Sequence, residues 1–320
     1  MTFHIPVMVQ QVLENLITRK MGIYVDCTVG GGGHAAKIIE KIYPEGCLIG
    51  IDQDIEALEF ARDKLRDYQD RIVLVKANFV DLEMILLYLG ITRISGIFFD
   101  LGISSHQVDT ATRGFSFSRD SLLDMRMDLS SELNAYYIVN HYPERELAEL
   151  FSKYGEERFS NSLAKLITQE RKKKPIETTE QLAKLISGFY ARHKKGKWRI
   201  QPATKVFQAL RIEVNRELSV LTETMLQAIK LTKTNGRIGV LSYHSLEDRI
   251  VKNIFREWEK TETINKYGYG LKRLFKKPIY PAEEEVRQNP RARSAKMRFA
   301  EKIELKEVSE NERDSFIRGK

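Results

Sequence analysis

Short apolar runs alternate with amphipathic segments along the first hundred residues. Apolar runs at 23–27, 47–52, 72–75 and 94–101 are separated by segments with helical spacing, most clearly at 55–65. Strands that are apolar throughout are typical of a parallel sheet covered by helices on both faces. The pattern therefore predicts four parallel strands joined by right-handed helical crossovers.

The alternation stops after residue 102, and no strand is predicted between there and residue 202. The helices expected in that stretch are 131–140, 144–154, 160–173 and 179–192. The elements expected after it are a long helix at 203–230, a strand at 236–242, a helix at 245–258 and a last strand at 297–300. We therefore predict a doubly wound, mostly parallel α/β domain with an inserted all-helical domain. The expected limits are 1–106 and 203–303 for the α/β domain, 107–202 for the insert and 304–320 for a polar C-terminal tail.

Composition excludes several classes of protein. Of the 320 residues, 42% are apolar and 30% are charged, which is ordinary for a globular chain with a full core. No run approaches the length of a membrane-spanning helix, and the N-terminus lacks the order of a signal peptide, so we expect a cytoplasmic protein without a membrane partner. Cys27 and Cys47 fall at opposite ends of neighbouring strands and are expected to be free thiols. The six histidines show no zinc-ligand spacing, so no metal is expected.

Charge is unevenly distributed along the chain. The net formal charge is +8, yet residues 165–205 alone hold twelve Lys and Arg against three Glu, a net of +9. Clustered cations favour a nucleic-acid partner, because phosphate neutralisation needs them close together. A solvated, lysine-rich helical face is the alternative interpretation.

Candidate ligand chemistry gathers where the predicted strands end. Gly30–Gly33 follows the first strand, Asp52 ends the second and Asp100 ends the fourth. Ligands of open α/β sheets bind at these carboxyl ends, and glycines let the backbone approach a ligand closely. The loop also fits a dinucleotide fingerprint, and a glycine-rich turn without any ligand stays open. Asp26, four residues before the first glycine, favours S-adenosylmethionine, since a carboxylate there would repel a pyrophosphate.

Several longer motifs identify a family more specifically than the glycine loop does. The segments that carry the resemblance are 22–34, 98–109, 113–117, 123–128 and 242–249. Together they make the chain resemble the bacterial ribosomal RNA small-subunit methyltransferase H family, from about His4 to Lys302. The resemblance implies a class I (Rossmann-like) methyltransferase fold and S-adenosyl-L-methionine as cofactor. It also implies methylation of the exocyclic N4 amine of a cytidine in the decoding region of 16S rRNA, with the small ribosomal subunit as partner.

The resemblance also implies site residues. Those for the cofactor are Gly32, Gly33, His34, Asp52, Phe79, Asp100 and Gln107. Asp100 is the first catalytic candidate, because a carboxylate that accepts from the cytosine amine would stabilise developing positive charge. His244 is a second catalytic candidate, followed by Ser104, Ser105 and Asp124, although Asp124 could instead pair with Arg126.

RNA contacts are expected from the basic and aromatic positions of the insert. They are Arg113, Phe115, Arg171, Lys172, Lys173, Lys174, Lys195, Lys197 and Arg199. Core packing is the alternative for Phe115, and a dimerisation surface, giving a homodimer, is the alternative for the whole insert. Two other functions stay open: an RNA-binding ribosome-assembly factor with a residual cofactor pocket, and an NAD-dependent oxidoreductase. The chain has no Pro-Pro-Tyr motif of the kind found in DNA cytosine-N4 enzymes.

Overall fold

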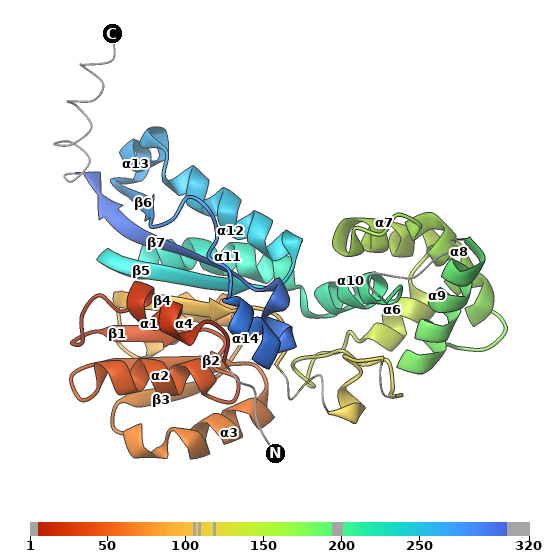
Figure 1. Cartoon of the computed structure of the whole chain (residues 1–320), viewed down its shortest axis with the longest axis horizontal. Coiled ribbons are helices and arrows are strands. Elements are labelled where there is room, and N and C mark those ends of the chain that lie inside the picture. Colours follow the sequence, from red (N-terminus) through yellow and green to blue (C-terminus); the bar gives the residue numbers. More distant parts are fainter. Residues whose placement is uncertain (1–5, 105–106, 108–109, 118–119, 194–200, 306–320) are drawn as a thin grey trace, which may run out of the picture. The chain divides into compact units, whose positions relative to one another are not determined.

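A computed structural model describes residues 6–104, 107, 110–117, 120–193 and 201–305. The chain forms two compact units (Figure 1). One combines the described residues up to Gly102 with those from Leu218 onward, and the other runs from Ile103 to Glu217.

The first unit is built on a seven-stranded sheet. Its strands are β1 (Ile23–Asp26), β2 (Cys47–Asp52), β3 (Ile72–Lys76), β4 (Ile94–Asp100), β5 (Thr232–Ser242), β6 (Tyr269–Arg273) and β7 (Lys296–Glu304). Their order is β3-β2-β1-β4-β5-β7-β6, with β1 to β5 parallel and β7 antiparallel to both its neighbours. The predicted doubly wound, mostly parallel sheet is confirmed, including all four N-terminal strands.

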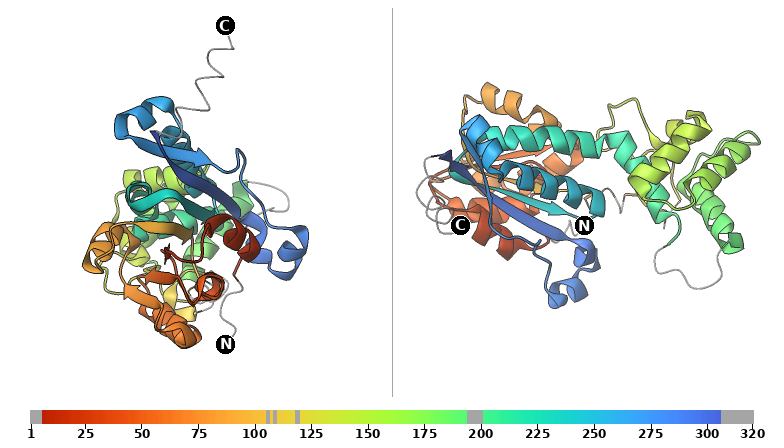
Figure 2. Two further views of the ribbon diagram at one scale, coloured as in Figure 1. Left: turned by 90° about the vertical axis from the view of Figure 1, so that its left-hand side faces the viewer. Right: turned by 90° about the horizontal axis from the view of Figure 1, so that it is seen from above.

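Side-chain alternation along the central strands gives the sheet two apolar faces. Tyr24 and Phe98 pack on one face with helices α1 (Val9–Leu16), α2 (Gly33–Ile42) and α3 (Ile55–Lys64). Val25 and Phe99 pack on the other face with α4 (Leu82–Tyr88), α11 (Glu217–Leu231) and α12 (Ser245–Trp258). Figure 2 shows helices on both faces of the sheet. Because both faces are covered, the strands need apolar residues at every position, which is why they read as uninterrupted runs.

The strand register determines how far three acidic residues extend at one edge of the sheet. Asp26, the last residue of β1, lies opposite Gly50 of β2 and Phe98 of β4. Asp52 and Asp100 therefore each extend two residues beyond Asp26, at the same edge of the sheet. The fold thus brings together the acids that the sequence placed at the strand ends.

The second unit is helical. It contains α6 (Ala135–His141), α7 (Glu144–Gly155), α8 (Ser160–Arg171), α9 (Thr179–His193) and α10 (Thr204–Asn215), which surround their own apolar core. The four predicted helices are present, although α6 begins at Ala135 rather than at residue 131. The unit also includes α10, which packs against α7 and α6.

Some elements differ from the prediction. The single helix expected at 203–230 is two helices, α10 and α11, because Arg216 between them adopts a left-handed conformation with φ of 50°. Strand β6 and helices α13 (Thr261–Tyr267) and α14 (Glu283–Gln288) were not predicted. Most of the expected tail, from residue 306, lies outside the described residues.

Two expectations from composition can be compared with the structure. Cys27 and Cys47 are free, as predicted, since Cys47 pairs in register with Ile23 at the far end of β1. Among the described residues, no helix is both long enough and apolar enough to span a bilayer.

Candidate cofactor and active site

The glycine loop after β1 is held by the acid that ends β2. Asp52 accepts a hydrogen bond from Gly30 N at 2.8 Å through Oδ2, and from Asp54 N at 2.9 Å through Oδ1. Gly32 has φ of 76°, and a Cβ atom there would lie 3.3 Å from Cα of Ala61 in α3. Glycine is therefore needed at Gly32 both for its backbone conformation and for close approach to α3. The loop leads directly into the amino end of α2, where free N–H groups favour negative or polar ligand atoms.

A chain of hydrogen bonds joins the acids of β1 and β4. Thr28 N donates to Oδ1 of Asp26 at 3.1 Å, and the Thr28 hydroxyl lies 3.5 Å from the same oxygen. The Thr28 hydroxyl also accepts from Asp100 N at 2.7 Å. Thr28 therefore fixes the spacing of the two strand ends, a role that the sequence analysis did not find.

His34 acts as the counter-ion of Asp100. Its Nε2 lies 2.8 Å from the carbonyl oxygen of Val7, and its Nδ1 lies 3.3 Å from Oδ2 of Asp100. Since a carbonyl oxygen only accepts, Nε2 carries a proton, and Nδ1 needs a second proton to bind a carboxylate. Burial is the largest single effect and lowers the pKa of His34, but the hydrogen bond and charge of Asp100, together with the Val7 carbonyl and the charge of Asp26, outweigh it, so the pKa is raised. Both ring nitrogens are thus engaged within the protein, and any contact of His34 with the cofactor would come from its backbone.

Tyr243 completes the surroundings of Asp100. It follows β5, and its hydroxyl donates to Oδ1 of Asp100 at 2.9 Å. The pKa of Tyr243 is raised well above its usual range, because the side chain is buried and faces the Asp100 carboxylate. The hydroxyl is therefore a permanent donor. The sequence analysis singled out 242–249 as a motif but did not assign this bond, which depends on β4 and β5 being neighbours.

Electrostatics at this edge favour a cationic ligand. Burial raises the pKa of Asp26 to about 7 and that of Asp52 to about 6. Of the three carboxylates, one has a histidine as counter-ion, so the edge holds more negative than positive charge when all are ionised. The methionine part of S-adenosylmethionine carries an ammonium and a sulfonium group, and its ribose offers two hydroxyl donors. The carboxylates present fit this group: Asp26 for the ammonium and Asp52 for the ribose.

Phe79 and Gln107, also predicted for the cofactor, lie in different units. Phe79 follows β3 and packs edge-on against Phe99 at a ring-centre distance of 5.8 Å, and it is half-buried. Ala77 N donates to the carbonyl oxygen of Asp52 at 3.0 Å. Phe79, two residues further along the chain, therefore follows β3 just beyond the end of β2. Gln107 belongs to the helical unit, where its side-chain oxygen accepts from Ser104 N at 3.1 Å. Its cofactor contact stays a prediction.

The remaining catalytic candidates have structural partners. His244 is the N-cap of α12: its Nδ1 accepts from Glu247 N at 3.4 Å, and Glu247 closes a capping box in return. Asp124 binds the Arg126 guanidinium through both oxygens, at 2.8 and 2.7 Å, which is the alternative that the sequence left open. Ser105 lies outside the described residues. Asp100 is thus the candidate that the geometry supports.

Several residues expected to bind RNA are instead engaged in the helical unit. Arg113 is 3% exposed and donates to the carbonyl oxygens of Arg126 and Met127, at 3.2 and 2.9 Å. Phe115 is 8% exposed within the helical core. Arg171 donates to the carbonyl oxygens of Val139 and Tyr142, both at 2.7 Å. The geometry does not support phosphate or base contacts by these three side chains, because the fold itself uses them.

The lysines after Arg171 remain available. Lys172, Lys173 and Lys174 are all exposed, and Lys173 pairs with Glu170 at 2.7 Å. Lys195, Lys197 and Arg199 lie outside the described residues. Of the named RNA-binding candidates within the described residues, Lys172 and Lys174 are therefore the exposed cations that no acidic side chain pairs with.

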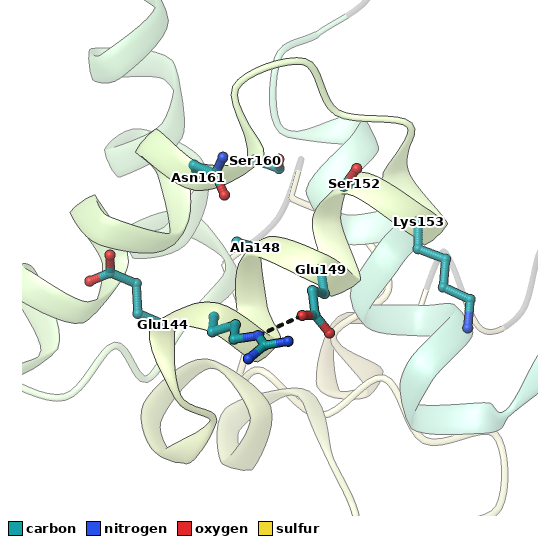
Figure 3. A pocket seen from close by; sticks show the side chains of 8 residues that line it. Glu144, Ala148, Glu149, Ser152, Lys153, Ser160 and Asn161 are labelled. Carbon is teal, nitrogen blue, oxygen red and sulfur yellow. Dashed lines mark hydrogen bonds and ion pairs between the residues drawn. The ribbon is translucent and has the colours of Figure 1, made fainter.

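A separate groove of about 770 Å³ opens between α7 and α8 (Figure 3). Small side chains line part of it, and charged side chains of both signs surround it. Arg145 pairs with Glu149 at 2.9 Å, and Glu144 accepts the Thr168 hydroxyl at 3.0 Å. Because these charges balance and none of the predicted residues lines it, the groove is not the cofactor site.

Comparison with known proteins identifies the family to which the chain belongs. The MraW methylase family model matches residues 1–303. The chain is 46% identical over 303 residues to the ribosomal RNA small subunit methyltransferase H of Sulfurihydrogenibium azorense, covering 95% of this chain and all of that protein. A solved rRNA methylase from Streptococcus thermophilus is 11% identical with a TM-score of 0.41, covering 92% of this chain and 94% of that one. An O-methyltransferase structure from Thermotoga maritima is 8% identical with a TM-score of 0.40, covering 92% and 64%. Structural likeness at that level decides nothing further.

The chain therefore belongs to the MraW methylase family. It is an S-adenosylmethionine-dependent methyltransferase with a class I, Rossmann-like sheet. Family membership excludes the NAD-dependent oxidoreductase that the glycine loop alone had left open.

Proposed function

We propose that this methyltransferase acts on ribosomal RNA of the small subunit, at the exocyclic N4 amine of a cytidine in the decoding region of 16S rRNA. The curated relative named above supports the RNA class, since it is a ribosomal RNA small subunit methyltransferase. The observation that carries the choice of an amine is the oriented carboxylate of Asp100 at the end of β4, bound on Oδ1 by Tyr243 and on Oδ2 by His34.

An exocyclic cytosine amine is a weak nucleophile, because its lone pair is delocalised into the ring. A carboxylate that accepts from the amine makes the nitrogen richer in electrons and stabilises the positive charge that develops on it. Each oxygen of Asp100 has one partner among the described residues, so a lone pair remains for the amine. Holding the carboxylate in one orientation also lowers the entropy cost of alignment.

The other residues at this edge of the sheet would bind and orient the cofactor. When bound, S-adenosylmethionine supplies a methyl group on a positively charged sulfur. Asp26 would bind the ammonium group of that molecule, and Asp52 would accept from its ribose hydroxyls as a charge-assisted acceptor. The half-buried ring of Phe79 offers an apolar surface for adenine. His34 neutralises Asp100 in part, which lets three acids share one edge of the sheet.

The partner follows from this substrate. We propose the small ribosomal subunit or its 16S rRNA, with Lys172 and Lys174 of the helical unit binding phosphate. The target base must leave its stack before its amine can reach the half-buried carboxylate of Asp100. A homodimer through the helical unit stays a second prediction.

A methyl-transfer assay tests the proposal. Purified protein and labelled S-adenosylmethionine are incubated with small subunits from cells that lack this enzyme, and the nucleosides are identified by mass spectrometry. We expect N4-methylcytidine with the unmodified protein and at least a hundredfold slower transfer with Asp100→Asn. Asp63→Asn, an exposed acid on α3, is the matched control and should have no effect. Methylation of another base would overturn the N4 assignment. Cofactor binding without any transfer would favour the assembly-factor alternative.

A further inference from the structure

The segment from the end of β6 to the start of β7 concentrates positive charge on the α/β unit. Residues 272–298 hold nine Lys and Arg against three Glu, a net of +6. Several of these cations have acidic partners: Arg298 binds Asp248 at 2.6 Å, Arg273 binds Glu259, and Arg287 binds Glu284 at 3.0 Å. Lys276, Lys277 and Arg293 are exposed, and within the described part of the chain no acidic side chain pairs with them.

Backbone hydrogen bonds hold this segment in place. Leu274 N donates to the carbonyl oxygen of Phe299 at 3.1 Å, and Ile279 and Met297 exchange two bonds of 2.9 Å. Residues 275–278 therefore project between two fixed points. Phe275 and Tyr280, beside these points, are 42% and 59% exposed. Exposed aromatic rings next to unpaired cations are typical of surfaces that bind single-stranded RNA.

Strand pairing places this surface at the catalytic edge. Asp100 lies opposite Leu241, Leu241 opposite Met297, and Met297 bridges to Ile279. Three neighbouring strand positions at about 4.8 Å each put Ile279 about 15 Å from Asp100. Arg293 lies in the turn Pro290–Ser294 just before β7, whose first residue pairs with Ser242 at the same edge. Figure 2 shows α14 and this turn projecting from the sheet.

We propose that Lys276, Lys277 and Arg293, with the rings of Phe275 and Tyr280, form a second RNA-binding surface that holds the strand beside the target nucleotide. The proposal rests on the proposed rRNA substrate. The cations bind backbone phosphates, and the rings stack on bases that flank the one being methylated. Each cation that binds a phosphate releases condensed counterions, so the surface contributes to the salt dependence of binding.

The test compares two triple variants of the full-length protein. Lys276→Ala/Lys277→Ala/Arg293→Ala removes the surface, and Lys20→Ala/Lys41→Ala/Lys64→Ala removes three exposed cations at the opposite edge of the sheet. Affinity for a 16S rRNA fragment that spans the decoding region is measured by fluorescence anisotropy from low to high salt. We expect the first triple to reduce the slope of log K against log salt by about 2 to 3 and to raise the KM for RNA, at unchanged cofactor affinity. The control triple should leave the slope unchanged.

The contribution of the aromatic rings is measured separately, as RNA affinity at an unchanged salt slope. Phe275→Ala should weaken RNA binding several-fold at an unchanged salt slope, because stacking releases no counterions. An unchanged slope in the first triple, or an equal loss of slope in the control triple, would overturn the proposal. Absence of methyl transfer by the unmodified protein would instead count against the proposed function, so the two failures are distinguishable. Cofactor affinity, measured by calorimetry, shows that each variant is folded.

Discussion

The Tyr243 hydroxyl donates to Oδ1 of Asp100 at 2.9 Å, and this bond joins the end of β5 to the end of β4. On the other side, Nδ1 of His34 lies 3.3 Å from Oδ2 of the same carboxylate. Asp100 is thus fixed by one neutral and one charged donor that come from different elements. A carboxylate held in this way is oriented before substrate arrives, which is what transition-state stabilisation by a fixed group requires.

Removing the hydroxyl should reduce catalysis more than binding. Tyr243→Phe keeps the packed ring but deletes one hydrogen bond to a charged group, an interaction of about 1.5 to 3 kcal/mol. We expect kcat to fall by roughly ten- to a hundredfold, with the KM for S-adenosylmethionine changed by less than threefold. Steady-state methyl transfer to small subunits measures both. Tyr88→Phe, which removes an exposed hydroxyl at the end of α4, is the control. A fall in cofactor affinity with constant kcat would mean that Tyr243 serves cofactor binding instead.

Cofactor affinity should rise with pH. Burial raises the pKa of Asp26 to about 7 in the free protein, so a large part of the population is protonated there at pH 6. An ammonium group beside Asp26 favours the carboxylate and lowers its pKa in the complex. Affinity therefore increases as pH rises to about 7 and then levels off, and a proton is released below that pH. Calorimetry at pH 6 and 8, in two buffers of different ionisation enthalpy, measures both effects. Asp26→Asn should bind weakly and keep only the smaller pH dependence that comes from Asp52, whose pKa is about 6.

Stability of the free protein should have the opposite pH dependence. The pKa of Asp26 rises from 3.8 to about 7 on folding, so between these values the folded state holds a proton that the unfolded chain has lost. The free energy of unfolding then falls as pH rises, by about 4 kcal/mol for a shift of this size. Asp26→Asn should therefore be more stable than the unmodified protein at pH 8 and similar at pH 4. Urea unfolding at both pH values measures this. An equal difference at both would contradict the assignment.

Most of the fold could be predicted because it depends on local patterns. The four N-terminal strands are apolar throughout, and α12 begins at Ser245 and ends at Trp258 as the periodicity predicts. Strand β6 was missed because Tyr269–Arg273 is short and contains both glycine and charge. The break at Arg216 was missed because both sides of it are strongly helical and the residue itself carries no turn signal.

The site could be predicted only in part. Asp26, Asp52 and Asp100 are visible in sequence, since each ends an apolar strand. The roles of Tyr243 and Thr28 depend on strand order and could not be predicted from local sequence. Tyr243 is 143 positions from Asp100 in the chain and Thr28 is 72 positions away, yet strand order brings both into contact with it. Arg113 and Arg171 show the reverse case: a basic residue beside an aromatic one, or within a basic block, looks like a phosphate ligand until its carbonyl partners are known.

The same basic segment therefore should separate into structural and RNA-binding residues. Arg171→Ala leaves the carbonyl oxygens of Val139 and Tyr142 without their donor and should lower the free energy of unfolding by about 2 to 3 kcal/mol. Lys172→Ala/Lys174→Ala touches exposed side chains only and should change stability by less than about 0.5 kcal/mol. Its effect should instead be a weaker RNA complex with a salt slope reduced by about 2. Urea unfolding and salt-dependent anisotropy distinguish the two variants. If the double lysine variant kept the full slope, phosphate binding by Lys172 and Lys174 would be excluded, and other cations of residues 165–205 would have to supply it.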